Sequence, residues 1–396
     1  MDRLINTVQH YAWGSVDALP ALLGTSPTGR PQAELWMGAH PISPSRLDRG
    51  HATAPSLLDV IEADPRAELG DATLHRHGVR LPFLLKLLAA AEPLSLQVHP
   101  DRSQAMKGYA REEAEGIPLT APHRSYKDDQ HKPELIVALS SFQGLCGFRD
   151  PQQSAALLAG LGVTALDDHV AVLREGASEE RALHDCVAAF LDVSPRMLEA
   201  VAESLARHAA EQGPDRESYA VYADIARRHP GDPGLLVAML LNIVRLSPGQ
   251  GLFLGAGVPH AYLAGLGVEI MASSDNVLRC GLTAKHIDVP ELLRIVRFSA
   301  SEPRVLAPRA HGEGEEVYDT PVDDFRLSRW VLSPGDGLRR FEAAAPQIML
   351  CTQGAVLLRT ATQQLRLQQG ESAYLPAGEA GAMQGGGTVF RATVNL

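Results

Sequence analysis

Short apolar runs separated by clusters of Pro, Gly and Ser fill the chain up to about Arg149. Leu81 to Leu88, Leu94 to Val98 and Glu134 to Leu139 are examples. Runs of this length, bounded by turn-forming residues, predict strands with helical interruptions. The same texture returns from about Ser247 to the C-terminus. Both ends of the chain are therefore predicted to be β-rich.

Residues 150–246 differ, because Ala, Leu, Glu and Arg recur there at helical spacing. Between Arg196 and Glu211, apolar residues follow one another at steps of three or four. Asp150, Ser194 and Asp232 each precede a proline, which is the arrangement of a capping residue before a first-turn Pro. The pattern predicts a helical insert of several helices.

An internal repeat lies in the third region. The segment from Leu246 to His260 aligns without gaps on the segment from Leu367 to Gly381, with Leu, Gly, Leu, Ala and Gly identical in both. A Gly turn, a short strand and a second Gly turn recur in cupin-like double-sheet jelly rolls. We therefore predict a mainly β fold with two cupin-like jelly-roll barrels and an α-helical insert. His260 becomes Gly381 in the second copy, so a metal ligand is expected in the first barrel only.

These patterns divide the chain into three predicted domains. Residues 1–149 and 247–320 form a split catalytic barrel, 150–246 form the helical insert, and 321–396 form a second barrel without metal. A chain of 396 residues has enough apolar material for several cores.

Composition narrows the classes of partner. The formal charge of −11 disfavours nucleic acid and anionic membranes but leaves room for a small anionic substrate. No apolar run is long enough to cross a bilayer, and the N-terminus does not resemble an export signal. The four cysteines form no C-x-x-C pair, so we expect buried thiols. A cytoplasmic monomer is expected, with no nucleic-acid or membrane partner.

Strand periodicity pairs two of four candidate metal ligands. In Leu94 to Asp101, residues two apart share a face, so Gln97 and His99 project together, with Ser95 beside them. Glu134 opens an apolar strand after a proline, and His260 follows a Gly-Val-Pro turn. One amide, two imidazoles and one carboxylate suit Zn²⁺ and also suit Fe²⁺ or Mn²⁺.

Longer motifs carry a resemblance to a known family. They are Ala33-Glu-Leu-Trp-Met-Gly-Ala-His-Pro41, Leu81-Pro-Phe-Leu-Leu-Lys86, Leu94 to Asp101, His131-Lys-Pro-Glu134, Val258-Pro-His-Ala-Tyr262 and Glu269 to Arg279. Together they closely resemble the type I mannose-6-phosphate isomerase (phosphomannose isomerase) family, from Tyr11 to Pro290. The resemblance implies two cupin-like barrels, a helical domain and one zinc held by Gln97, His99, Glu134 and His260.

The resemblance also implies an activity. It is the interconversion of D-mannose 6-phosphate and D-fructose 6-phosphate through a cis-enediol, serving GDP-mannose and glycan synthesis or mannose catabolism. Its only implied partner is a small sugar phosphate.

Roles for neighbouring residues come from the same resemblance and from the chemistry. Arg279 suits a developing enediolate, Lys132 or Glu269 would move the proton, and His131 could relay one. A metal-bound water is a third candidate base. The residues implied to bind the substrate are Ser95, Lys86 and Lys285 at the phosphate, and Trp13, Glu34 and Tyr262 along the site.

Two other functions share the ligand set. Two His and a Glu can form the facial triad of a non-haem iron oxygenase, but lysines and an arginine around the site favour a phosphorylated substrate. A non-catalytic sugar-binding cupin would require loss of the metal set or of Arg279, and both are present.

Overall fold

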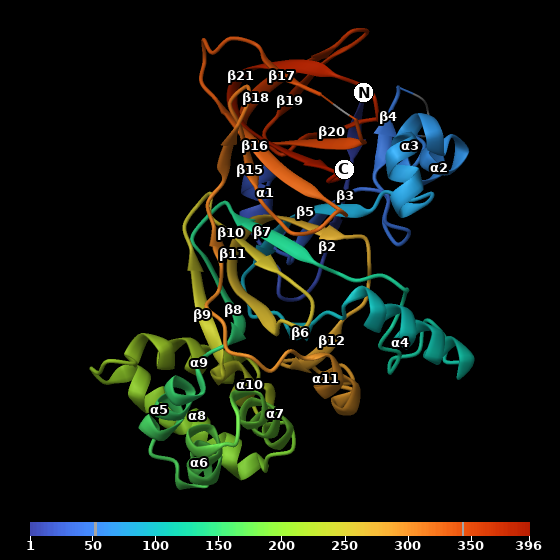
Figure 1. Ribbon diagram of the computed structural model, residues 1–396. Helices are drawn as coiled ribbons and strands as arrows, with labels where there is room; N and C mark the ends of the chain where they lie inside the picture. Colours follow the sequence, from blue (N-terminus) through green and yellow to red (C-terminus); the bar gives the residue numbers. More distant parts are fainter. Residues whose placement is uncertain (51–53, 343) are drawn as a thin grey trace.

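The computed structural model describes residues 1–50, 54–342 and 344–396. Figure 1 shows two β-sheets above a bundle of helices, with both chain termini beside the upper sheet. The fold is mainly β with helices, as the apolar pattern predicts. All four cysteines are buried and unpaired. Within the ranges described, no helix combines the length and the apolar character needed to span a membrane.

The first sheet is organised around β11, which pairs with β5, β6, β7 and β8. All residues of β5 are buried, which explains its unbroken apolar pattern apart from Lys86. The strands of this sheet are β2 (Thr7–Gln9), β3 (Glu34–Met37), β5 (Phe83–Ala90), β6 (Leu96–Val98), β7 (Glu134–Ala138), β8 (Phe142–Phe148), β9 (Leu241–Leu246), β10 (Gly251–Leu254), β11 (His260–Ala272), β12 (Leu278–Gly281) and β13 (Val305–Leu306).

The second sheet contains strands from both ends of the chain. Its strands are β1 (Asp2–Ile5), β4 (Arg46–Asp48), β14 (Arg309–His311), β15 (Glu315–Tyr318), β16 (Arg326–Leu332), β17 (Arg339–Phe341), β18 (Gln347–Thr360), β19 (Gln364–Gln368), β20 (Ser372–Leu375) and β21 (Gly381–Thr393). β1 and β4, predicted to lie in the first barrel, belong to this sheet, and so do β14 and β15. The apolar pattern of a strand does not reveal its pairing partner, so the sequence did not predict that these four strands pair in the second sheet.

Neither sheet closes into a barrel within the described ranges. The pairing of the first sheet runs from β13 to β2 and that of the second from β14 to β4, so both are open. The strand pairing thus shows two open sheets and does not by itself establish the two cupin-like jelly-roll barrels predicted from sequence. An apolar cluster that includes Leu85 and Val137 of the first sheet and Leu327 and Ile348 of the second packs between them.

The repeat predicted from sequence has a structural counterpart. The ungapped alignment that pairs Leu246 with Leu367 places β10 on β20 and β11 on β21 residue for residue. His260 and Gly381 are the first residues of their strands. A Cβ at Gly381 would lie 2.5 Å from the carbonyl oxygen of Arg359, so the second copy has no room for a side chain there.

The middle of the chain forms helices below the first sheet (Figure 1). They are α5 (Pro151–Gly160), the 3₁₀ turn η1 (Thr164–Leu166), α6 (Asp167–Glu175), α7 (Glu179–Phe190), α8 (Pro195–Ala210), α9 (Arg216–Arg228) and α10 (Gly234–Met239). Asp150 and Ser194 cap α5 and α8 as predicted. The last residues of the predicted insert instead form β9, which pairs with β8.

The remaining helices connect strands of the two sheets. They are α1 (Ala18–Leu23), α2 (Leu57–Ala63), α3 (Pro65–His77), α4 (Arg102–Ala114) and α11 (Val289–Ile295).

Candidate metal centre and cleft

Three strands of the first sheet bring His99, Glu134 and His260 together. His99 follows β6, while Glu134 and His260 open β7 and β11, and all three side chains are buried. Their ligand atoms lie within 4.8 Å of one another. Among the described His, Cys, Asp and Glu residues, this is the group found to have metal-site geometry.

Hydrogen bonds fix both imidazoles in the orientation that a metal needs. Nδ1 of His99 lies 2.9 Å from the backbone oxygen of Asn276, and Nδ1 of His260 lies 3.0 Å from that of Val258. Because a carbonyl can only accept, each Nδ1 donates, which in a neutral ring leaves the lone pair on Nε2 for a metal. Both Nε2 atoms therefore face Glu134.

The spacing of the donors fits a small divalent cation. Nε2 of His99 is 3.2 Å from Oε1 of Glu134, and Nε2 of His260 is 3.5 Å from Oε2. Ligands at about 2.0–2.1 Å from a tetrahedral zinc lie about 3.4 Å apart. Nε2 of His99 is also buried without a hydrogen-bond partner within the described ranges. The residues present thus fit a metal.

Protonation states agree with that fit. Burial lowers the pKa of His99 to about 4, so its imidazole is neutral near pH 7. Burial alone would raise the pKa of Glu134, but the Lys132 ammonium beside it helps to hold that pKa well below its usual range. Neutral imidazoles and an ionised carboxylate are the metal-binding forms.

Gln97 shares this face of the sheet. The antiparallel register places Gln97 of β6 opposite both His260 of β11 and Arg279 of β12. Directly paired residues project from the same face. Gln97 also lines a small cavity of about 70 Å³ together with Glu134 and His260. Its side chain is thus placed beside the three-residue cluster.

The small cavity adjoins a larger cleft of about 570 Å³, since Glu34, Lys86, Leu94, Gln97 and Lys132 line both. Glu269 and Tyr262 line the inner cavity alone. The predicted residues that line the cleft alone are Trp13, Ser95, Arg279 and Lys285. A space of this size accommodates a hexose phosphate.

Comparison with known proteins shows that this chain is similar to phosphomannose isomerases. Residues 1–151 match the family model described as phosphomannose isomerase type I, catalytic domain. The mannose-6-phosphate isomerase of Escherichia coli (strain K12) is 42% identical over 382 residues, which cover 96% of this chain and 95% of that protein. The chain belongs to the type I phosphomannose isomerase family.

Other members of the family agree. The human mannose-6-phosphate isomerase is 32% identical over 403 residues, covering 94% of this chain and 92% of that protein. A crystal structure of mannose 6-phosphate isomerase bound with zinc and yttrium has a TM-score of 0.91 at 40% identity, and all of both chains is covered. A variant of the Salmonella typhimurium enzyme has a TM-score of 0.92 at 39% identity over the same extent. Zinc is therefore the metal that fits both the family and this donor set.

Lys86 lies in a buried cage of carboxylates in this isomerase fold. Its Nζ is 3.1 Å from Oε2 of Glu269 and 3.5 Å from Oε1 of Glu34. Burial opposes the charge, but the Glu34, Glu269 and Glu134 carboxylates outweigh it and raise the pKa of Lys86. The indole Nε1 of Trp36 donates to Oε2 of Glu34 over 2.7 Å. Lys86 is thus a buried counter-ion as well as a cleft residue.

Arg279 and Lys285 differ from Lys86, because no carboxylate pairs with either among the described residues. Burial lowers the pKa of Arg279, and burial together with the charge of Arg279 lowers that of Lys285. Two neighbouring cations without counter-ions make this end of the cleft suited to an anion.

The structure does not bring His131 to the metal centre. Its Nε2 lies 2.6 Å from Oδ2 of Asp324, while the next residue, Lys132, lies 3.4 Å from Oε1 of Glu134. The two neighbours thus have different partners, and only Lys132 contacts the metal cluster. His131 instead connects this segment to the loop before β16.

Tyr262 lies in the inner cavity, whereas Trp13 lies in the outer cleft. The Tyr262 hydroxyl is buried without a hydrogen-bond partner in the described part of the chain, and burial with the charges of Glu269 and Glu134 raises its pKa. Trp13 lies at the cleft and stacks on Tyr11, with the ring centroids 5.7 Å apart.

Sequence reasoning missed two residues that shape the centre. Trp36 lies two residues after Glu34 on β3. This spacing places both side chains on one face of the strand, and it is the signal by which Trp36 could have been found. Asn276 lies within the motif from Glu269 to Arg279, yet it contacts His99 through its backbone oxygen. A contact of that kind leaves no signal in residue identity.

Proposed function

We propose that the chain interconverts D-mannose 6-phosphate and D-fructose 6-phosphate at this cleft. The observation that carries the proposal is the buried His99, Glu134 and His260 cluster. Glu134 and His260 line the inner cavity, which adjoins a cleft lined by Arg279 and Lys285. Gln97 is proposed as the fourth ligand, because its register places it on the same face. The relatives named above carry the same activity in their names.

The phosphate is proposed to bind at the Arg279 and Lys285 end, with Ser95 as a hydroxyl donor on the same cleft. Lys86 is less suited to that role, because two carboxylates already neutralise its ammonium group. This assignment revises the phosphate role predicted for Lys86. Trp13, Glu34 and Tyr262 are proposed to line the sugar.

The proposed reaction moves protons only. A base takes the proton from C2 of the aldose and returns it to C1, while the O2 hydroxyl proton moves to O1. The cis-enediol lies between the two sugars, and no oxidant or reductant is consumed. A zinc held by the cluster would supply Lewis acidity toward the sugar oxygens.

Lys132 is the residue we assign to proton transfer, because it lines both the inner cavity and the cleft. Glu269 lines only the inner cavity, and its carboxylate is paired with Lys86. We therefore propose that Glu269 keeps Lys86 in place. Arg279 would stabilise the enediolate as a permanent cation.

Further expectations accompany this function. The protein is expected to be a monomer located in the cytoplasm. It is expected to supply mannose for GDP-mannose and glycan synthesis, or to serve mannose catabolism. The cupin-like jelly-roll arrangement remains a proposal, supported by the correspondence of β10 with β20 and of β11 with β21. So does the three-domain division predicted from sequence.

A coupled assay that converts mannose 6-phosphate to fructose 6-phosphate tests the proposal. The zinc-loaded protein should turn over this substrate without oxygen uptake. Oxygen consumption, or zinc-loaded protein inert toward mannose 6-phosphate, would replace the isomerase proposal with another use of the metal.

A further inference from the structure

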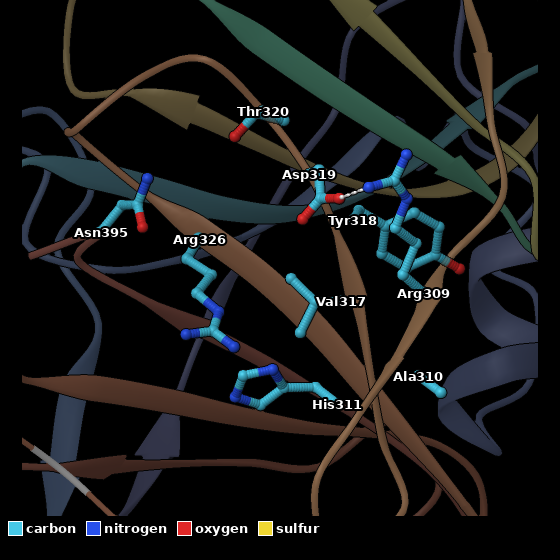
Figure 2. A pocket seen from close by; sticks show the side chains of 9 residues that line it. All are labelled: Arg309, Ala310, His311, Val317, Tyr318, Asp319, Thr320, Arg326 and Asn395. Atoms are coloured by element: carbon cyan, nitrogen blue, oxygen red, sulfur yellow. Dashed lines mark ion pairs between the residues drawn. The ribbon is translucent and has the colours of Figure 1, made fainter.

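A second cleft of about 350 Å³ lies at the edge of the second sheet (Figure 2). It is lined from β14, β15, β16 and the C-terminal segment by Arg309, Ala310, His311, Val317, Tyr318, Asp319, Thr320, Arg326 and Asn395. None of these residues lines the isomerase cleft. The two spaces are therefore separate.

Arg326 is a cation without a counter-ion in this second cleft. Its guanidinium makes no ion pair with the described residues, and its Nε is buried without a hydrogen-bond partner. The neighbouring arginine is neutralised, because Nη1 of Arg309 lies 3.2 Å from Oδ2 of Asp319. In Figure 2 the Arg326 guanidinium points toward the His311 ring, away from that pair.

The polar character of this face continues into the protein interior. Strand register pairs Ser328 of β16 with Arg391 of β21, and Arg326 with Thr393. Ser328 lies two residues after Arg326 and so projects from the same face. The Oγ of Ser328 and the Nε of Arg391 are buried without hydrogen-bond partners among the described residues. Arg391 is itself paired with Glu315.

Unpartnered polar atoms of this kind are rare inside proteins. Arg326 and His311 supply N–H donors and Thr320 adds a hydroxyl group, so the lining favours an oxyanion. Guanidinium groups match phosphate geometry with paired N–H donors. The volume exceeds that of a bare phosphate and falls in the range of small-ligand sites.

We propose that this second cleft binds the phosphate group of a small phosphorylated metabolite, with Arg326 as the principal contact. The site is independent of the isomerase reaction. It also assigns chemistry to the C-terminal part of the chain, where the sequence alone indicated none.

Calorimetric titration of the zinc-loaded protein with inorganic phosphate tests the proposal. The natural sequence should show two binding components, one in each cleft. Arg326→Gln should weaken one component about tenfold or more, while turnover of mannose 6-phosphate stays unchanged. Arg279→Gln should weaken the other component.

Arg329→Gln is the matched control. Arg329 lies on the same strand and carries the same charge, but it pairs with Glu316 and does not line the cleft. It should leave both components intact. Equal weakening by Arg326→Gln and Arg329→Gln, or a single component that only Arg279→Gln removes, would overturn the proposal.

A second ligand separates phosphate from anions in general. Succinate at matched concentration should not displace the component that depends on Arg326. Displacement by succinate would overturn the phosphate assignment. Because this component is measured without turnover, its absence and a failure of the isomerase proposal are distinguishable.

Discussion

Lys132 places its Nζ 3.4 Å from Oε1 of Glu134, at the junction of the inner cavity and the cleft. The pair thus connects a proposed metal ligand to a proposed proton-transfer group. Both side chains are buried, so the ammonium lies beside the metal cluster rather than in bulk solvent.

Replacing Lys132 should lower the rate of proton transfer without reducing the amount of zinc bound. We expect Lys132→Met to lower kcat by about 10²–10⁴-fold, because a positioned proton-transfer group contributes on that scale. Zinc content per chain, measured by atomic emission, should stay near that of the unchanged protein. His131→Gln is the neighbouring control and should reduce kcat far less, since His131 contacts Asp324. A comparable loss in both variants would contradict the assignment.

The Lys86 cage predicts a stability effect. Lys86→Met should reduce the free energy of unfolding by about 3 kcal/mol, because it leaves two buried carboxylates without their cation. Urea denaturation measures the change. Adding Glu269→Gln should restore part of the loss by removing one unpaired charge. A double variant less stable than Lys86→Met would show that the cage is not electrostatic.

Asn276 predicts a linkage between loop structure and metal affinity. Its Nδ2 donates to the backbone oxygen of Gln130 over 2.8 Å, and its own backbone oxygen accepts from His99. Asn276→Ala should therefore lower zinc affinity by about 10–100-fold, the range seen for partners that orient metal ligands. Competition with a fluorescent zinc chelator measures the zinc affinity. An unchanged affinity would contradict the linkage between this loop and the metal centre.

The metal-free protein should lose stability as the pH falls. The pKa of His99 is about 4 when folded, against an ordinary value of 6.5. Between these values the unfolded chain binds the extra proton, so the free energy of unfolding decreases as the pH falls from about 6.5 toward 4. We expect His99 to contribute about 1–3 kcal/mol to this change.

Urea denaturation at pH 7 and pH 5, with chelator present, measures that contribution. His99→Asn should flatten the pH dependence, whereas His75→Asn on the exposed side of α3 should leave it unchanged. Identical pH dependence in the His99 variant and the unchanged protein would contradict the shift.

The sequence predicts the centre better than the architecture around it. Strand periodicity alone places Gln97 and His99 on one face, because the period of a strand is two. Glu134 and His260 lie far away in the chain, and only resemblance to a family connected them to that pair. Their convergence depends on β7 and β6 both pairing with β11, which no local pattern encodes.

Misplaced predictions have the same physical origin. His131 and Lys132 are adjacent and both suited to proton transfer, but only Lys132 contacts Glu134, while His131 contacts Asp324. The strand from Asp2 to Ile5 joins the second sheet because it pairs with β20, nearly the whole chain away. Such long-range pairing depends on the tertiary fold rather than on local composition.

Metal removal tests the central claim most directly. Isomerase activity and zinc content should be measured on one sample before chelation, after chelation and after zinc is restored. We predict that activity falls in proportion to zinc, is lost in the metal-free protein, and returns at one zinc per chain. Full turnover of mannose 6-phosphate by protein without metal would contradict the account.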